Sequence, residues 1–162
     1  MNEAQKHRAR ADDAELIEVW FRIEKDADGY PESKSWEGLL ARREDTGFRL
    51  ESVPFYLKNV SRGDVVAATA GRFLEFSRVV KRGGHNTYRL LLKRIQPDDP
   101  GRTLNELIKL GLAVEEEHGL LIAVDVPPTV NQMAIDSYLV AQKESGRWEI
   151  QDGYLSSIAT SS

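Results

Sequence analysis

Hydrophobic and polar positions in the second half of the chain follow two periods in turn. Tyr88, Leu90 and Leu92 are apolar at every second position, as in a half-buried strand, and the next apolar stripe, from Leu104, has helical spacing. Read in this way, the half gives strand 87–94, helix 103–111, strands 113–117 and 120–126, helix 129–146 and strand 148–150. This order predicts a ferredoxin-like βαββαβ unit with both helices on one sheet face.

Capping signals place the helix ends. Thr103 and Glu106 have capping-box spacing, and Gly111 can adopt the left-handed conformation that ends a helix. Thr129 and Gln132 repeat the capping-box spacing. The buried face expected for the second helix, which runs as far as Gly146, consists of Val130, Ala134, Ile135, Tyr138, Leu139 and Ala141. His118-Gly119 is expected to form the tight turn of the hairpin.

The first half is rich in strand patterns. Ile17, Val19, Phe21 and Ile23 alternate with polar residues and Trp20, and further short strands are predicted at 36–43, 48–53, 64–70 and 73–81. Such spacing is typical of a small curled sheet or barrel, and the whole chain is therefore predicted to be α+β. The predicted divisions are a flexible N-terminus (1–15), a strand-rich subdomain (16–84), a ferredoxin-like subdomain (85–155) and a flexible C-terminus (156–162).

Two strand pairings conflict where the first half of the sequence meets the second. Strands 73–81 and 87–94 are joined by 83–86 and resemble a hairpin, yet a ferredoxin-like sheet already gives strand 87–94 two neighbours. Either the hairpin pairs only at its tip or strand 148–150 is displaced from the edge. The sequence leaves both arrangements open.

Composition narrows the class of protein. With 162 residues, 41% of them hydrophobic, the chain can bury a core, and no apolar run approaches the roughly 20 residues of a membrane span. The polar first residues resemble no signal peptide, so we expect a cytoplasmic protein. The chain has no cysteine and three histidines, which excludes disulfides and thiolate chemistry. We expect no cofactor and no metal.

Charge and motifs narrow the function. Residues 87–162 hold 7 Lys/Arg and 11 Asp/Glu, whereas residues 1–86 hold 15 of each, so the net charge of −4 lies in the second half. This charge argues weakly against general nucleic-acid binding and is compatible with a basic protein partner. Phosphate-binding glycine motifs, a nucleophile elbow and a zinc-helix histidine pair are absent from the sequence.

His85 is the strongest single candidate for chemistry. It lies in a glycine-led loop among basic residues, where backbone N–H groups and cations could hold an anion, and Asp64 could complete an acid–base pair with it. The structural alternatives are a turn histidine packed on Tyr88 and an aspartate that closes the 61–63 turn. Supporting binding residues would be Thr87 and Arg89.

Three broader groups of residues are weaker candidates. A phosphate-contacting stripe with Tyr88 as a stacking ring would use Arg78, Lys81, Arg82, Arg89, Lys93 and Arg94. The carboxylates of Glu115 and Glu117 with His118 could hold a metal, although a charged edge strand explains them as well. An aromatic surface would comprise Trp20, Tyr30, Trp36, Tyr56 and Trp148, of which Trp20 is opposite the apolar face of its strand; the alternative is that both faces are covered.

Several segments resemble a known family. They are WFRIEKDADGYP, SWEGL, VPFYLKNVSRGDVV, RVVKRGGHNTYRLLL, LIKLGLAVEEEHGLLIAVDVPP and GRWEIQDGYL. Together they are similar to the bacterial domain of unknown function family 4265, over nearly all of 16–155. That family has serine-glycine-histidine-serine-threonine where this chain has residues 83–87, so His85 and Thr87 match whereas Gly83 and Asn86 depart. The resemblance implies a bacterial origin and adds no activity.

Three hypotheses follow. The first is a non-enzymatic protein-binding module, in its narrower form an immunity or antitoxin-like inhibitor of a basic protein. The second is a small enzyme or anion-binding module centred on His85. The third is nucleic-acid binding through a hairpin from Arg78 to Arg94. The partner, any catalysis and the oligomeric state stay open at this level.

Overall fold

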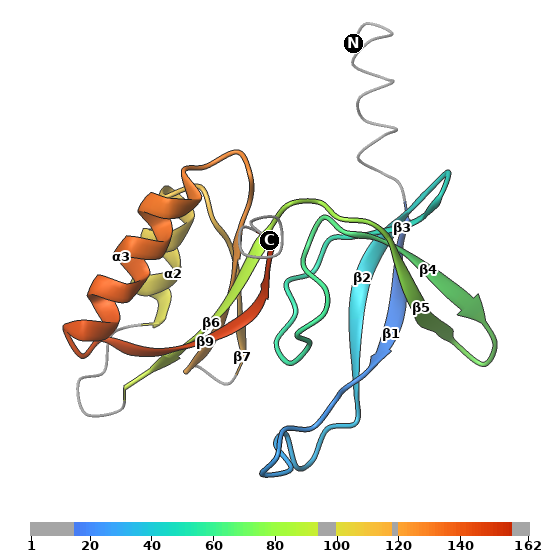
Figure 1. Ribbon diagram of the computed structural model, residues 1–162, viewed down its shortest axis with the longest axis horizontal. Coiled ribbons are helices and arrows are strands. Elements are labelled where there is room, and N and C mark those ends of the chain that lie inside the picture. Colours follow the sequence, from blue (N-terminus) through green and yellow to red (C-terminus); the bar gives the residue numbers. More distant parts are fainter. Residues whose placement is uncertain (1–14, 94–99, 118–119, 157–162) are drawn as a thin grey trace, which may run out of the picture.

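The chain forms a strand-rich α+β fold with two sheets and two helices (Figure 1). The computed structural model describes residues 15–93, 100–117 and 120–156. The first sheet contains β1 (Leu16–Arg22), β2 (Trp36–Glu44), β3 (Gly47–Leu50), β4 (Val65–Ala70) and β5 (Leu74–Lys81). The second half contains β6 (Asn86–Leu92), α2 (Pro100–Lys109), β7 (Ala113–Glu117), β8 (Leu121–Val126), α3 (Gln132–Glu144) and β9 (Trp148–Leu155). The α+β prediction is therefore confirmed.

The first sheet is antiparallel from β1 to β5 in sequence order. Its two ends meet, because β1 also pairs with β5 in parallel at Val19↔Leu74 and Trp20↔Glu75. The inward positions of the alternating strands build a core of Val19, Phe21, Ile23, Leu39, Ala41, Leu50, Leu57, Val60 and Val66. The polar residues that alternate with them on β1 include Glu18 and Arg22, which are exposed.

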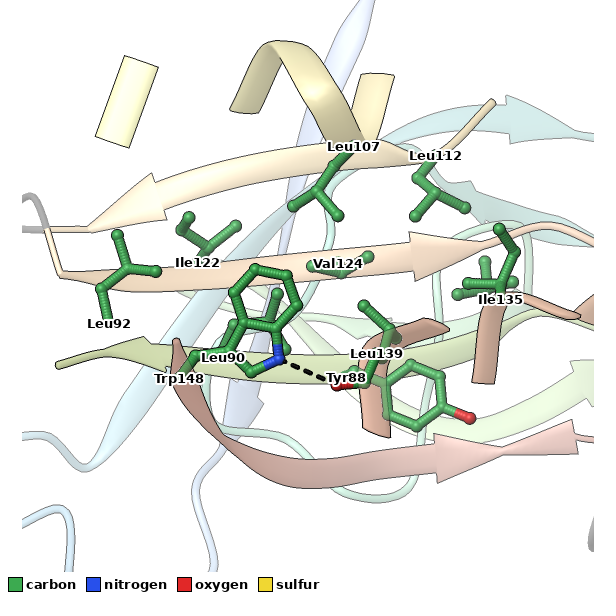
Figure 2. Packing of buried hydrophobic residues seen from close by; sticks show 11 residues of the cluster. Tyr88, Leu90, Leu92, Leu107, Leu112, Ile122, Val124, Ile135, Leu139 and Trp148 are labelled. Atoms are coloured by element: carbon green, nitrogen blue, oxygen red, sulfur yellow. Dashed lines mark hydrogen bonds between the residues drawn. The ribbon is translucent and has the colours of Figure 1, made fainter. Parts of the chain in front are cut away.

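The second sheet is antiparallel and has the strand order β7-β8-β6-β9. Both helices cover the same face of it (Figure 1). Figure 2 shows the apolar residues between helices and sheet, where Trp148 is fully buried and donates its indole N–H to the carbonyl of Leu139 at 3.1 Å. The remaining buried members are Tyr88, Leu90, Leu92, Leu107, Leu112, Ile122, Val124, Val126 and Ile135.

The predicted hairpin between 73–81 and 87–94 is wrong. Strand β5 belongs to the first sheet, whereas β6 pairs with β8 and β9 in the second. The chain therefore crosses from one sheet to the other at 82–85, and β9 keeps its edge position beside β6. Strands that are adjacent in sequence usually pair, which is why a hairpin was expected. Here β5 pairs within the first sheet and β6 within the second.

The helix starts also differ from the predicted capping boxes. Helix α2 already begins at Pro100, so Thr103 lies inside it, fully buried, and accepts a hydrogen bond from Arg147 at 3.1 Å. Helix α3 is capped by Asn131, whose side chain accepts from the Ala134 N–H at 3.1 Å. Of the face predicted for α3, Ile135 and Leu139 are buried, whereas Ala134 and Ala141 are exposed. The helix ends just before Gly146, as predicted, and the predicted His118-Gly119 turn lies outside the described residues.

Strand alternation on β6 connects the two halves. Tyr88, Leu90 and Leu92 face the helices, so Thr87 and Arg89 lie on the opposite face. The segment 51–64, which connects β3 to β4, lies between the two sheets (Figure 1) and contacts this opposite face. We call the contact between 51–64 and the sheet the junction.

Candidate functional site

His85 is held at the junction by a carboxylate that the sequence analysis overlooked. Its Nδ1 lies 2.8 and 3.0 Å from the two oxygens of Asp125, which is fully buried on β8. Arg62 lies 3.6 Å from the same carboxylate. The ring packs against Gly63 rather than against Tyr88, whose hydroxyl donates to Asp136 on the helix side at 2.8 Å.

This arrangement limits what His85 can do. A carboxylate on Nδ1 fixes the ring and favours a proton on that nitrogen, which leaves Nε2 as the potential base. Among the described residues, however, Nε2 has no hydrogen-bond partner and faces the Gly63 backbone. Within the part of the chain that the structure describes, no hydroxyl is hydrogen-bonded to Nε2 as a nucleophile would be, and the sequence contains no thiol.

Asp64 does not pair with His85. Its carboxylate accepts from the Ser61 N–H at 3.0 Å, which closes the 61–63 turn, and from the Gly83 N–H at 2.8 Å. Arg82 completes the group with an ion pair of 3.0 Å. The predicted acid–base pair is therefore wrong, and Asp64 instead fixes the point where the chain crosses between the sheets.

Thr87 is buried in the same region. Its Oγ1 lies 2.6 Å from Oγ of Ser61, and both residues are fully buried. The pair joins β6 to segment 51–64 and gives each hydroxyl a partner away from water. Thr87 is thus part of the junction and is not exposed for ligand binding.

The carboxylates of β7 also join the two halves. Glu115 accepts from the Val53 N–H at 2.8 Å, and burial raises the pKa of Glu115 above its ordinary value. Glu117 accepts hydrogen bonds from both the Tyr56 hydroxyl and the Lys34 ammonium. Burial and the Glu117 carboxylate raise the pKa of Tyr56 to about 12. The described residues contain no group of three potential metal ligands, and His118 lies outside them.

Arg89 is the most unusual residue of the junction. Only 2% of it is exposed, and its Nη2 donates to the carbonyl of Leu57, while Nη1 lies 3.5 Å from the carbonyl of Asp152. Its Nε is buried and has no hydrogen-bond partner. No carboxylate lies within ion-pair distance of Arg89 in the described residues, although buried arginines are normally paired.

Glu37, the acidic residue that attracts Arg89, is already engaged. Both oxygens of Glu37 accept backbone N–H groups, from Phe55 at 2.6 Å and from Tyr56 at 3.0 Å. Burial lowers the pKa of Arg89 and raises the pKa of Glu37, and their mutual attraction opposes both shifts. The Arg89 guanidinium therefore keeps hydrogen-bonding capacity and positive charge that the described residues satisfy only in part.

A cleft opens beside Arg89. It has a volume of about 570 Å³, within the range of ligand sites. Its lining residues are Tyr30, Tyr56, Arg89, Leu91, Glu117, Leu120, Leu121, Glu149, Ile150 and Gln151. A second hollow of about 420 Å³ shares Tyr30 and Tyr56 and continues along the loop between β1 and β2. We call the two hollows, which share these tyrosines, the Arg89 groove.

The other predicted binding residues do not gather at one place. Arg78 lies on β5 in the first sheet, Arg82 pairs with Asp64 and stacks on the Tyr154 ring at 3.9 Å, and Lys93 pairs with Glu149 at 3.0 Å. The basic residues therefore do not form one stripe on a hairpin, and Arg94 lies outside the described residues.

The aromatic residues are also divided. Trp20 and Trp36 pack on Phe73 with ring centroids 6.2 and 5.4 Å away, whereas Trp148 is in the second core. Tyr30 and Tyr56 face each other at 6.3 Å in the Arg89 groove. The single aromatic surface is thus wrong, but two of its members share the groove.

Sequence reasoning overlooked Asp125 and misjudged Arg89. The signal for Asp125 was an acidic residue within the apolar run 121–126, since a buried carboxylate needs a partner. The alternation of β6 placed Arg89 opposite the core, but only the fold shows that segment 51–64 covers it.

In the described part of the chain, no helix combines the length and apolar character required to cross a bilayer.

Comparison with known proteins places the chain in a wider group. The model of the family described as "Domain of unknown function (DUF4265)" matches residues 37–150. No curated protein is significantly similar in sequence. The crystal structure of a hypothetical protein from Neisseria gonorrhoeae is similar to this chain with a TM-score of 0.68 and 17% identity. The similarity covers 87% of this chain and 96% of that one, and it shows a shared fold.

Proposed function

Because the chain belongs to the DUF4265 family, whose activity is not known, we propose its function from geometry: it is a non-enzymatic binding protein that holds a segment of a partner protein in the Arg89 groove. The observation that carries this proposal is the position of Arg89, a buried and incompletely satisfied cation, in an otherwise largely aliphatic and aromatic cleft. Such a combination of largely apolar walls and a few polar or charged groups is typical of binding sites.

The shape of the groove favours a protein segment as the ligand. The 570 Å³ cleft and the 420 Å³ hollow meet at Tyr30 and Tyr56, so an extended chain could run along both. Tyrosine is enriched in protein interfaces, and Tyr30 is 49% exposed here. Leu91, 51% exposed, adds an apolar contact on β6.

The charge distribution favours a basic partner. The net charge of −4 lies in residues 87–162, which also supply most of the lining of the cleft. An acidic surface accelerates and orients association with a basic protein. In its narrower form the proposal is an immunity or antitoxin-like inhibitor, which needs a rigid complementary surface and no chemistry.

A pull-down with matched variants tests the proposal. Tagged wild type, Leu91→Arg in the groove and Leu40→Arg on β2 would be incubated with extract of the native host. Leu40 is 42% exposed and lies outside the groove, so its variant controls for an added surface charge. We expect wild type and Leu40→Arg to recover the same stoichiometric partner and Leu91→Arg to lose it. Equal recovery by both variants would contradict a site in the groove.

The second candidate, an anion-binding or catalytic site at His85, is favoured by the 2.8 Å contact with buried Asp125. Titration of the protein with inorganic phosphate should then shift the ring resonances of His85. Unchanged resonances at millimolar phosphate would exclude an anion site there. Nucleic-acid binding, the third hypothesis, would require affinity that falls steeply with salt.

The strand arrangement supports two finer structural proposals. The parallel contact of β1 with β5 is compatible with a small barrel, and the strand order β7-β8-β6-β9 is compatible with a ferredoxin-like unit. Neither proposal affects the position of the groove.

A further inference from the structure

In the Arg89 groove, the guanidinium of Arg89 offers hydrogen-bond donors and a positive charge that suit a carboxylate, and it has no acidic partner among the described residues. The guanidinium has five N–H donors, of which the described residues engage those directed at the Leu57 and Asp152 carbonyls. These carbonyls carry no net charge. A carboxylate on a ligand would supply both an acceptor and a counter-charge to a cation that is otherwise buried without an ion pair.

The acidic residues of the lining do not take this role. Glu117 is bound by Lys34 and Tyr56, and Glu149 pairs with Lys93 at 3.0 Å. Each of these carboxylates thus pairs with a lysine, and neither forms an ion pair with Arg89. Glu37 attracts Arg89, but its carboxylate oxygens already accept backbone N–H groups.

The walls around Arg89 are suited to an apolar group next to the carboxylate. Leu91 and Leu121 lie on neighbouring strands β6 and β8, where they are directly paired, and Tyr56 lies opposite on segment 51–64. Gln151, paired with Arg89 across β6 and β9, offers an amide to a backbone group. Such a site has one charged anchor, an apolar pocket and a polar side.

From this geometry we propose that the Arg89 groove captures the C-terminal residue of a partner chain, with the terminal carboxylate at Arg89 and an apolar last side chain against Leu91 and Leu121. The inference rests on the proposed function, because it specifies which part of the partner enters the groove. A chain end is favoured over an internal segment because its carboxylate is attached to the same Cα as an apolar side chain, which suits Arg89 beside Leu91 and Leu121. It is favoured over a free fatty acid because Gln151 offers an amide to a backbone group, which a fatty acid lacks.

The test uses three probes and the full chain. A hexapeptide that ends in leucine with a free carboxylate, the same peptide as its C-terminal amide, and decanoate would each be titrated into ¹⁵N-labelled protein. We expect the free peptide to shift the amide resonances of Leu91, Leu121 and Gln151 and to bind at least about tenfold more tightly than the amide. Decanoate should bind more weakly than the free peptide, since it lacks the backbone groups.

Variants separate recognition from folding. Arg89→Lys keeps the charge but loses the planar fork, and it should weaken binding of the free peptide by about tenfold. Since position 89 is buried, a second variant at an exposed position is needed: Leu91→Glu should repel the carboxylate and weaken the free peptide more than the amide. Leu40→Glu, on β2, should bind like wild type.

Four results would overturn the inference. They are equal affinity for peptide and amide, absence of shifts from the free peptide at millimolar concentration, decanoate binding more tightly than the peptide, and a Leu91→Glu variant that binds like Leu40→Glu. The wider proposal fails separately, through the pull-down: a partner lost in Leu91→Arg together with equal peptide and amide affinities would keep the groove as a binding site and exclude chain-end recognition.

Discussion

Gly63 lies directly against the ring of His85, so that a Cβ atom at position 63 would be only 2.5 Å from Nε2. The contact joins the 61–63 turn of segment 51–64 to the chain that enters the second sheet. Gly63 also has φ of +87°, a conformation that other residues adopt at a cost. Two constraints therefore act on one residue at the junction.

The first prediction follows from this contact. Gly63→Ala should lower the free energy of unfolding by about 3 kcal/mol, because it adds a steric conflict to the left-handed backbone. Gly29→Ala is the matched control: φ is +78° there, but nothing lies within 4 Å of the added atom, so we expect a loss of about 1 kcal/mol. Urea denaturation of both variants measures the difference, and equal losses would contradict the steric role of His85.

The second prediction concerns Asp125. Among the described residues, His85→Ala leaves the buried Asp125 carboxylate with Arg62, at 3.6 Å, as its charged partner, so we expect a destabilisation of about 3 kcal/mol. Arg102→Ala breaks an exposed pair with Glu106 and should cost no more than about 0.5 kcal/mol. A double-mutant cycle with Asp125→Ala should show coupling between positions 85 and 125. Additive effects would indicate that the contact has no energetic role.

The third prediction uses the tyrosine at the junction. Since the folded pKa of Tyr56 is about 12 and its unfolded value is about 10, stability due to the neutral hydroxyl is complete below pH 10 and is lost as the pH rises to 12. Ultraviolet absorbance of phenolate should show a late step near pH 12 that is smaller in Tyr56→Phe. The variant should also lose less stability over this range. An unchanged late step would place Tyr56 among ordinary tyrosines.

The fourth prediction compares adjacent residues of α3. Leu139 is fully buried between helix and sheet, whereas Val140 is 40% exposed. Leu139→Ala should therefore cost about 3 kcal/mol through lost burial and a cavity, and Val140→Ala should cost about 0.5 kcal/mol. Chemical denaturation checks both values. Similar costs would mean that α3 packs on the sheet through a different face.

Local periodicity was sufficient to predict most elements. The alternation of Tyr88, Leu90 and Leu92 identified β6 and the face it buries, because strand side chains alternate whatever their partner. The partners of β5 and β6, which lie in different sheets, were not predictable, since the choice of partner depends on surfaces that meet only after folding. The capping box at Thr103 failed for a related reason: Thr103 has a tertiary partner in Arg147.

The candidate site was predictable only in part. His85 was identified from its loop, but its partner came from position 125, 40 residues later, on a strand that looked wholly apolar apart from the one acid. Arg89 was expected to bind an anion together with His85, whereas the structure places it in the lining of the groove beside Tyr56 and Leu91. Its burial arises because segment 51–64 covers the sheet, and no short-range pattern in the sequence records that contact.

Strand β6 contributes one face to the hydrophobic core and the other to the junction and the groove. The same seven residues supply apolar groups to the core on one face and Thr87, Arg89 and Leu91 to the junction and groove on the other. Insertion or deletion of a single residue at the start of β6 would move the side chains that follow to the opposite face and place the guanidinium of Arg89 among the apolar residues under α3. A change of register in this strand would therefore alter the hydrophobic core and the groove at the same time.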